Sequence, residues 1–385
     1  MEQELENESL DSAFRKIREY LEKLKSTELN IAVTGETGKG KSTFINAIRG
    51  LRKNDIGSAP TGVVETTMEP TAYPYPKYPN VKLWDLPGIG TENFKADPYL
   101  KLVGFDRYDF FIIISERFTS NDANLAREIQ RMGKRFYFIR SKIDQSLYGE
   151  KMANETTFNE EYFLDLMRKD CITGLEKLNM KSPEVFLVSS FNLGKYDFHK
   201  FQETMEKEMP EHTKNVFLLA LPNITRDIIE KKKNMLEANI WKMALMSGGV
   251  AAVPFPALGF GVDVLILMRE IHKYLKAFGL DEASLKSLSK HAKVPVEVLK
   301  KATMSGFIDE ITRDKVIKLL MKVAGVGLMV ADNFLSAIPV IGSMVAGGIS
   351  FCTTYRMLKL CLDQLAQDAH RVLLTAFPSA GKVDV

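Results

Sequence analysis

The sequence contains Leu29-Asn30-Ile31-Ala32-Val33-Thr34, and GETGKGKSTF follows directly at residues 35–44. Residues 31–34 are apolar and mostly β-branched, which predicts a buried strand. Residues 35–42 match G-x-x-x-x-G-K-[ST], and Phe44 to Ile48 continues as a helix. A strand, a glycine-rich loop and a helix in this order predict a P-loop, whose backbone N–H groups bind phosphate at a helix N-terminus.

Each residue of this loop has an expected place around a nucleotide. Lys41 should reach the β- and γ-phosphates and take part in catalysis, and the Ser42 hydroxyl should ligate Mg²⁺. For Lys39 a solvated side chain is favoured, while contact with a phosphate or a partner subunit stays open. A βα turn without a ligand is the alternative, against which the flanks and spacing both argue. The expected nucleotide-binding residues of the loop are Gly35, Glu36, Thr37, Gly38, Lys39, Gly40, Lys41, Ser42 and Thr43.

A second motif predicts recognition of guanine. Phe136 to Arg140 is typical of a strand, and Ser141-Lys142-Ile143-Asp144 follows it, similar to the [N/T]-K-x-D element of GTPases. The Asp144 carboxylate can accept hydrogen bonds from the ring N–H and exocyclic amine of guanine, a donor pair that adenine lacks. Lys142 would lay its alkyl stem along the base. Ser141 replaces the usual Asn or Thr but keeps a hydroxyl.

A further strand should complete the base site. Val185 to Ser190 is an apolar run that ends in two serines. We expect this strand to deliver Ser189 and Ser190 to the base in a short polar turn.

Elements that contact Mg²⁺ and the γ-phosphate are expected between the P-loop and the base motif. The strand at Val81 to Asp85 ends in D-x-x-G, so Asp85 should hold Mg²⁺ and the Gly88 N–H should meet the γ-phosphate. The loop at 89–94 is a candidate switch. Thr61 follows Ser42 at a separation suited to a second Mg²⁺ ligand. Glu65 has three open interpretations, namely surface charge, ribose contact or catalysis.

Taken in order, these segments resemble the immunity-related GTPases, an interferon-inducible group of dynamin-like proteins. The segments that carry the resemblance are GETGKGKSTFINAIRG, TGVVETTMEP, WDLPGIGT, YDFFIIIS, FYFIRSKID and VFLVSS, and it extends through LPNITRDIIEKKK. Gly40-Lys41-Ser42 is similar to the Gly-Lys-Ser type of this family rather than the Gly-Met-Ser type.

The resemblance implies an α/β, Ras-like P-loop GTPase domain and an all-α helical domain. The expected domains are an N-terminal helix at 1–27 that packs with the helical domain, a GTPase domain at 28–215 and a helical domain at 216–385. It also implies GTP-dependent self-assembly, with itself or related family members, and action at intracellular membranes in cell-autonomous defence. The expected ligands are GTP or GDP with Mg²⁺.

Hydrolysis needs a residue that orients water, and Ras-type proteins use a Gln shortly after D-x-x-G. Ile89-Gly90-Thr91 contains no Gln. A single subunit should therefore be slow, and the missing group should arrive when two nucleotide faces meet. The resemblance makes Glu65 the candidate for a ribose-mediated contact and activation across that interface.

The C-terminal half contains two long uncharged stretches. A helix is expected from Thr225 to Ala252, and the uncharged stretches are 243–262 and 333–355. Each is about long enough to span a bilayer, and each is interrupted by proline. Three interpretations stay open, namely the core of a helical bundle, apolar helix–turn–helix tips that enter a membrane when exposed, or a permanent transmembrane span, which is the least favoured.

Composition excludes several other classes. Lysine and arginine number 52 against 49 acidic residues, a net charge of +3 that is too weak to predict nucleic-acid binding. The three cysteines are scattered, without disulfide or zinc spacing. The acidic start predicts no secretory signal, and Glu2 excludes the N-myristoylation pattern. A cytoplasmic protein with peripheral or conditional membrane association is expected.

Three function classes fit these features. The first is a self-assembling, dynamin-like GTPase that acts on membranes. The second is a GTP-regulated binding module with little turnover, which the missing Gln keeps open. The third, a structural membrane protein with a vestigial nucleotide site, is disfavoured because all three nucleotide motifs are intact.

Overall fold

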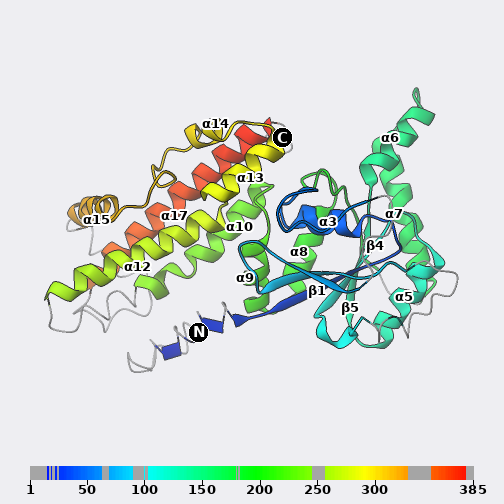
Figure 1. The fold of residues 1–385 in the computed structure, drawn as a ribbon, viewed down its shortest axis with the longest axis horizontal. Coiled ribbons are helices and arrows are strands. Elements are labelled where there is room, and N and C mark those ends of the chain that lie inside the picture. The colour runs from blue at the N-terminus through cyan, green and yellow to red at the C-terminus, as the bar shows by residue number, and fades with distance from the viewer. Residues whose placement is uncertain are drawn as a thin grey trace. The chain divides into compact units, whose positions relative to one another are not determined.

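The computed structural model describes most of the chain in two compact units. The described residues are 15, 16, 19, 22, 23, 26–62, 69–89, 99, 103–178, 180, 183–244, 256–327 and 348–378. One unit comprises Ser26–Pro222, and the other comprises Met1–Lys25 with Asn223–Val385 (Figure 1). Each unit is built around its own hydrophobic core.

The first unit is an α/β domain with a six-stranded sheet. Within the described residues the strand order is β2-β3-β1-β4-β5-β6, and only the β2–β3 pair is antiparallel. The α/β fold expected from the sequence is confirmed, and the strands expected at 31–34, 81–85 and 136–140 are present. The strands are β1 (Leu29–Thr34), β2 (Thr71–Pro74), β3 (Val81–Asp85), β4 (Phe110–Ser115), β5 (Arg135–Arg140) and β6 (Val185–Leu187).

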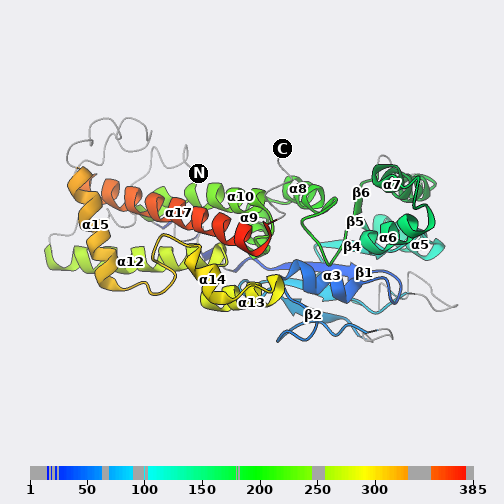
Figure 2. The same ribbon diagram turned by 90° about the horizontal axis from the view of Figure 1, so that it is seen from above.

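Both faces of this sheet are covered, which explains why its strands are apolar on both sides. All six residues of β4 are buried. Phe111, Ile113 and Phe138 pack into one core with residues of α5 and α7, whereas Phe44 of α3 contacts Phe201 of α8 on the other side (Figure 2). The helices of this unit are α3 (Lys41–Ile48), α5 (Ser120–Arg131), α6 (Ile143–Ala153), α7 (Glu160–Glu176), α8 (Phe198–Glu208) and α9 (Glu211–Ala220), with the 3₁₀ turn η1 (Phe105–Arg107).

The second unit is helical. Its long helix α17 (Gly348–Ala376) contacts α10, α12 and α15. Between α10 and α17, Lys233 forms an ion pair of 3.0 Å with Asp363, and Glu230 lies 2.7 Å from Nε2 of His370. The other helices are α10 (Arg226–Glu237), α12 (Pro256–Ala277), α13 (Glu282–Ala292), α14 (Val296–Lys301) and α15 (Arg313–Gly327).

The prediction of one helix from Thr225 to Ala252 is wrong, because the observed helix is shorter. Helix α10 ends at Glu237, and residues 238 and 239 form a turn before a short helical segment at 240–244. The side-chain amide of Asn239 donates to the carbonyl oxygen of Met235 at 2.9 Å. This bond satisfies one of the carbonyl groups that a helix leaves open at its end.

Much of both uncharged stretches lies outside the described residues. Residues 245–255 and 328–347 are not described, and residues 256–262 and 348–355 belong to α12 and α17. Across the part of the chain that the structure describes, no helix combines the length and apolarity needed to cross a membrane.

Candidate nucleotide-binding site

The phosphate-binding loop, residues 35–42, leaves β1 at the carboxyl edge of the sheet. Gly35 has φ +136°, and a Cβ atom there would lie 2.1 Å from the carbonyl oxygen of Ile114. No residue with a side chain fits this turn. The loop ends at Gly40, the N-cap of α3, so the first N–H groups of α3 and its dipole point towards the loop.

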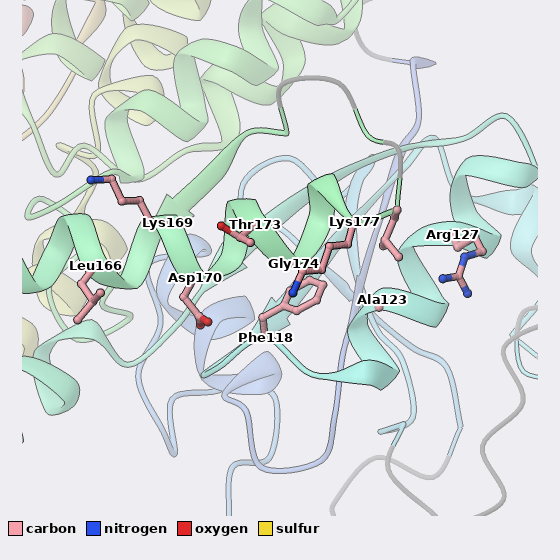
Figure 3. A pocket seen from close by; sticks show the side chains of 10 residues that line it. Phe118, Ala123, Arg127, Leu166, Lys169, Asp170, Thr173, Gly174 and Lys177 are labelled. Atoms are coloured by element: carbon pink, nitrogen blue, oxygen red, sulfur yellow. The ribbon is translucent and has the colours of Figure 1, made fainter.

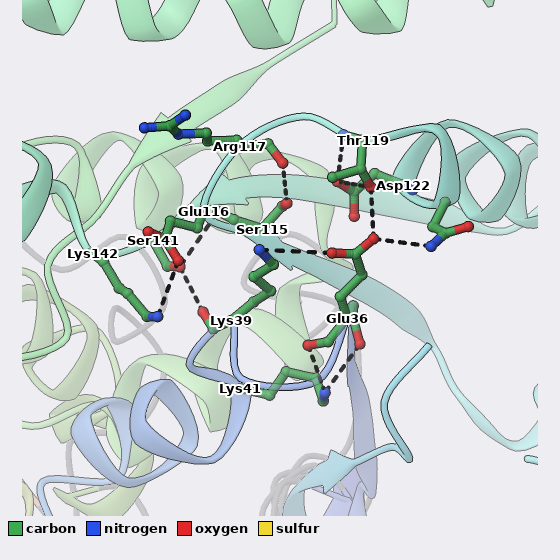
Figure 4. Close-up of polar contacts among 12 residues, drawn as sticks. Glu36, Lys39, Lys41, Ser115, Glu116, Arg117, Thr119, Asp122, Ser141 and Lys142 are labelled. Atoms are coloured by element: carbon green, nitrogen blue, oxygen red, sulfur yellow. Dashed lines mark hydrogen bonds and ion pairs between the residues drawn. The ribbon is translucent and has the colours of Figure 1, made fainter. Parts of the chain in front are cut away.

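Lys41 is held inside the loop. Its Nζ donates hydrogen bonds to the carbonyl oxygens of Gly35 at 3.0 Å and Glu36 at 3.1 Å, and the side chain is 7% exposed (Figure 4). An ammonium group over a turn of N–H donors provides positive charge where phosphate oxygens would lie. Lys39, expected in solvent, is instead half-buried with Nζ 3.7 Å from Glu36 Oε2.

The D-x-x-G element lies directly against this loop. The Ser42 hydroxyl donates to Oδ2 of Asp85 at 2.5 Å, and Asp85 is fully buried. A Cβ atom on Gly88 would lie 2.0 Å from Oγ1 of Thr37, so only glycine allows this approach. A hydroxyl and a carboxylate are the hard oxygen ligands that Mg²⁺ prefers. Ser42 and Asp85 therefore fit a magnesium site.

The roles of two other expected residues stay predictions. Thr61 is half-buried in the loop between α3 and β2, and its role as a Mg²⁺ ligand stays a prediction. Glu65 lies outside the described residues, as does most of the candidate switch loop from residue 90 onwards.

The base motif lies next to the phosphate-binding loop. The Ser141 hydroxyl donates to the carbonyl oxygen of Lys39 at 2.7 Å, so the residue that departs from the usual Asn or Thr ties the two motifs together (Figure 4). Lys142 is the N-cap of α6 with φ 57°, and its Nζ contacts Glu116 Oε2 at 3.1 Å. Burial raises the pKa of Glu116, but the hydrogen bond and charge of Lys142 outweigh it and lower that pKa overall.

Two of the buried oxygens at this edge that have no hydrogen-bond partner among the described residues belong to the expected base site. They are Oδ1 of Asp144, in the first turn of α6, and Oγ of Ser189, two residues after the end of β6. The backbone N–H of Ile143 donates to the carbonyl oxygen of Val188 at 3.5 Å, which places the two segments side by side. Buried polar groups are normally paired. An acceptor and a hydroxyl without partners therefore fit the polar edge of a base.

The loop after β4 also contacts the phosphate-binding loop, which was not predicted from the sequence. Thr119 and Asp122 form a capping box at the start of α5, and Thr119 and Asn121 also contact Glu36 (Figure 4). A T-x-x-D pattern after an apolar strand is a signal for a helix start. It does not reveal that this helix start faces the phosphate-binding loop.

A hollow of about 650 Å³ lies elsewhere in this unit, between α5 and α7 (Figure 3). Phe118 and Gly174 meet at its wall, and a Cβ atom on Gly174 would lie 2.3 Å from the Phe118 ring. None of the expected nucleotide-binding residues lines this hollow.

Comparison with known proteins agrees with this geometry. The family described as interferon-inducible GTPase (IIGP) matches residues 1–376. Interferon-inducible GTPase 5 of Bos taurus is 41% identical over 372 residues, which cover 96% of this chain and 80% of that protein. Interferon-gamma-inducible GTPase 10 of Mus musculus is 40% identical over 364 residues, 93% of this chain and 84% of that protein. Interferon-inducible GTPase 1 of Mus musculus is 38% identical over 303 residues, 78% of this chain and 73% of that protein.

Proposed function

This chain belongs to the interferon-inducible GTPase family, and we propose that it binds GTP with Mg²⁺ and hydrolyses it to GDP and phosphate. The observation that carries the proposal is the pair of partnerless buried oxygens, Asp144 Oδ1 and Ser189 Oγ, at the sheet edge that holds the phosphate-binding loop. Asp144 would accept the ring N–H and exocyclic amine of guanine. Asp144 and Ser189 also support the proposal that residues 28–215 form the GTPase domain.

Each group of the site then has a role in the reaction. Lys41, with the N–H groups of residues 35–43, binds the β- and γ-phosphates, and Ser42 and Asp85 hold Mg²⁺ with Thr61 as a further ligand. The bound Mg²⁺ supplies positive charge against the phosphate oxygens. The Gly88 N–H donates to the γ-phosphate, where negative charge moves during transfer.

Turnover is proposed to depend on self-assembly. Ile89-Gly90-Thr91 supplies no Gln to orient the attacking water. A second copy, or a related family member, would complete the site when two nucleotide faces meet, with Glu65 acting across the interface. We propose that this activity takes place in the cytoplasm, at intracellular membranes, in cell-autonomous defence.

The test is the dependence of specific GTPase activity on protein concentration. An assembling enzyme hydrolyses more GTP per molecule as the protein concentration rises, because the completed site needs two copies. A Lys41→Ala preparation at each concentration controls for contaminating activity. Tight GTP binding with negligible turnover at every concentration would instead support the second candidate, a GTP-regulated binding module, which the missing Gln favours.

A further inference from the structure

Glu36 of the phosphate-binding loop is bound by residues of a different element. Its Oε1 accepts a hydrogen bond from the Thr119 hydroxyl at 3.1 Å and another from the side-chain amide of Asn121 at 3.0 Å. Both donors lie at the start of α5, more than 80 residues along the chain (the Thr119 contact spans 83). The carboxylate therefore anchors the loop to the end of a neighbouring helix (Figure 4).

The backbone of Glu36 contacts two parts of the proposed nucleotide site, namely Lys41 and the end of the D-x-x-G segment. Its carbonyl oxygen accepts from Nζ of Lys41 at 3.1 Å, and its main chain forms an isolated parallel bridge with Ile89. Ile89 follows Gly88, whose N–H group is proposed to meet the γ-phosphate. A displacement of Glu36 would therefore move both the Lys41 ammonium group and the end of the D-x-x-G segment.

The Thr119 hydroxyl has one hydrogen and two carboxylates within reach. Its Oγ1 lies 3.1 Å from Glu36 Oε1 and 2.9 Å from Asp122 Oδ2. Asp122 Oδ2 also accepts the backbone N–H of Thr119 at 2.9 Å. Because Oδ2 of Asp122 also accepts this backbone N–H, the Thr119 hydroxyl can donate its hydrogen to Glu36 and Oδ2 of Asp122 still has a donor.

We propose that Glu36 is a positioning residue, which Thr119 and Asn121 hold so that its carbonyl oxygen and its bridge to Ile89 fix Lys41 and Gly88 for the phosphates. This inference rests on the proposed function, since it assigns a task within the same site. Glu36 acts through Lys41 and needs no contact with the nucleotide.

The test is calorimetric titration of the full-length protein with GDP and with a non-hydrolysable GTP analogue, both with Mg²⁺. Glu36→Ala and Thr119→Val should each weaken binding about tenfold, the scale of one hydrogen bond to a charged group. Glu36→Gln keeps an acceptor oxygen and Thr119→Ser keeps the hydroxyl, so both should bind like wild type. Glu128→Ala, at the far end of α5 with its partner Arg131 on the surface, is the matched control.

The double variant separates positioning from a general effect on the fold. If the two side chains act through one contact, Thr119→Val added to Glu36→Ala should cost no further affinity. Wild-type affinity in Glu36→Ala would overturn the positioning role. A double variant whose loss of affinity equals the product of the two single losses would also overturn it. If Glu36→Ala does not fold, the Val and Ser variants of Thr119 decide alone, and equal affinity in both overturns it. Absence of guanine-nucleotide binding by the wild type would overturn the proposed function, and this inference with it.

Discussion

The hydroxyl of Ser42, at the start of α3, donates a 2.5 Å hydrogen bond to the carboxylate of Asp85, at the end of β3. The two residues lie 43 positions apart, and parallel pairing of β1 with β3 brings them together. A magnesium ion bound by both oxygens would replace the direct hydrogen bond. Ser42 and Lys41 are adjacent, but Ser42 is proposed to bind the magnesium cation and Lys41 the anionic phosphates. Variants of the two residues should therefore have different effects.

Lys41→Ala and Ser42→Asn should impair the protein in different ways. Loss of the Lys41 ammonium removes a hydrogen bond to a charged phosphate, which costs about 2 kcal/mol, or roughly thirtyfold in GTP affinity, and abolishes turnover. Ser42→Asn should mainly weaken Mg²⁺-dependent GTP binding and favour the GDP form. Titration of GTP and GDP with Mg²⁺ and with chelator measures both effects.

A surface lysine provides the control for this pair. Lys53→Ala removes an exposed positive charge shortly after α3 and should leave binding unchanged. Hydrolysis at the wild-type rate in both site variants would show that residues 35–42 do not hold the phosphates.

Asp144→Asn should exchange guanine for xanthine specificity. The amide offers a donor where xanthine carries a carbonyl group, and it loses an acceptor for the guanine amine. We expect GTP affinity to fall at least about tenfold, the scale of one hydrogen bond to a charged group, and xanthosine triphosphate binding to appear. Asp106→Asn, an exposed carboxylate in the same unit, should change neither affinity. Unchanged GTP affinity in Asp144→Asn would remove Asp144 from the base site.

Local patterns predicted much of this site because its motifs are contiguous. The strand β1, the loop 35–42 and the helix α3 are all encoded within one stretch, and β5 leads directly into Ser141 to Asp144. Such elements are specified by periodicity and by glycine at fixed positions. The family and the fold class followed from the same segments, and both are confirmed.

The contacts of Glu36 could not be predicted in this way. They depend on β4 pairing beside β1, which brings the start of α5 to the phosphate-binding loop. Such pairing joins residues far apart in the chain, and no local pattern specifies it. The prediction of a helix up to Ala252 was also wrong. The uncharged run that begins at residue 243 gave no local signal for the helix end at Glu237.

The uncharged stretch at 243–262 gives a prediction about membranes. Phe255 lies outside the described residues and is proposed to sit at an apolar tip that meets lipid in the GTP state. A charge is costly in hydrocarbon, so Phe255→Asp should keep GTP binding and its melting temperature but lose co-sedimentation with liposomes in the presence of a non-hydrolysable GTP analogue. If Phe255 is core instead, burying the charge should lower the melting temperature markedly.

Val298→Asp is the control for the membrane prediction. This side chain is 44% exposed on α14, and a charge there should affect neither melting nor liposome binding. Normal melting together with normal liposome binding in Phe255→Asp would exclude both a membrane role and a core role for Phe255.

The buried Asp122 should make stability depend on pH. Burial, with a further contribution from the Glu36 carboxylate, raises the pKa of Asp122 from 3.8 to about 6. The folded protein therefore binds this proton more tightly than the unfolded chain, so the stability it contributes is complete below about pH 4 and is lost as the pH rises to about 6. Asp122→Asn removes the titration and keeps an acceptor for the Thr119 N–H. The gain in unfolding free energy over wild type should be about 2 kcal/mol larger at pH 7.5 than at pH 4.5, measured by urea denaturation. An equal difference at the two pH values would show that Asp122 ionises as easily in the fold as in the unfolded chain.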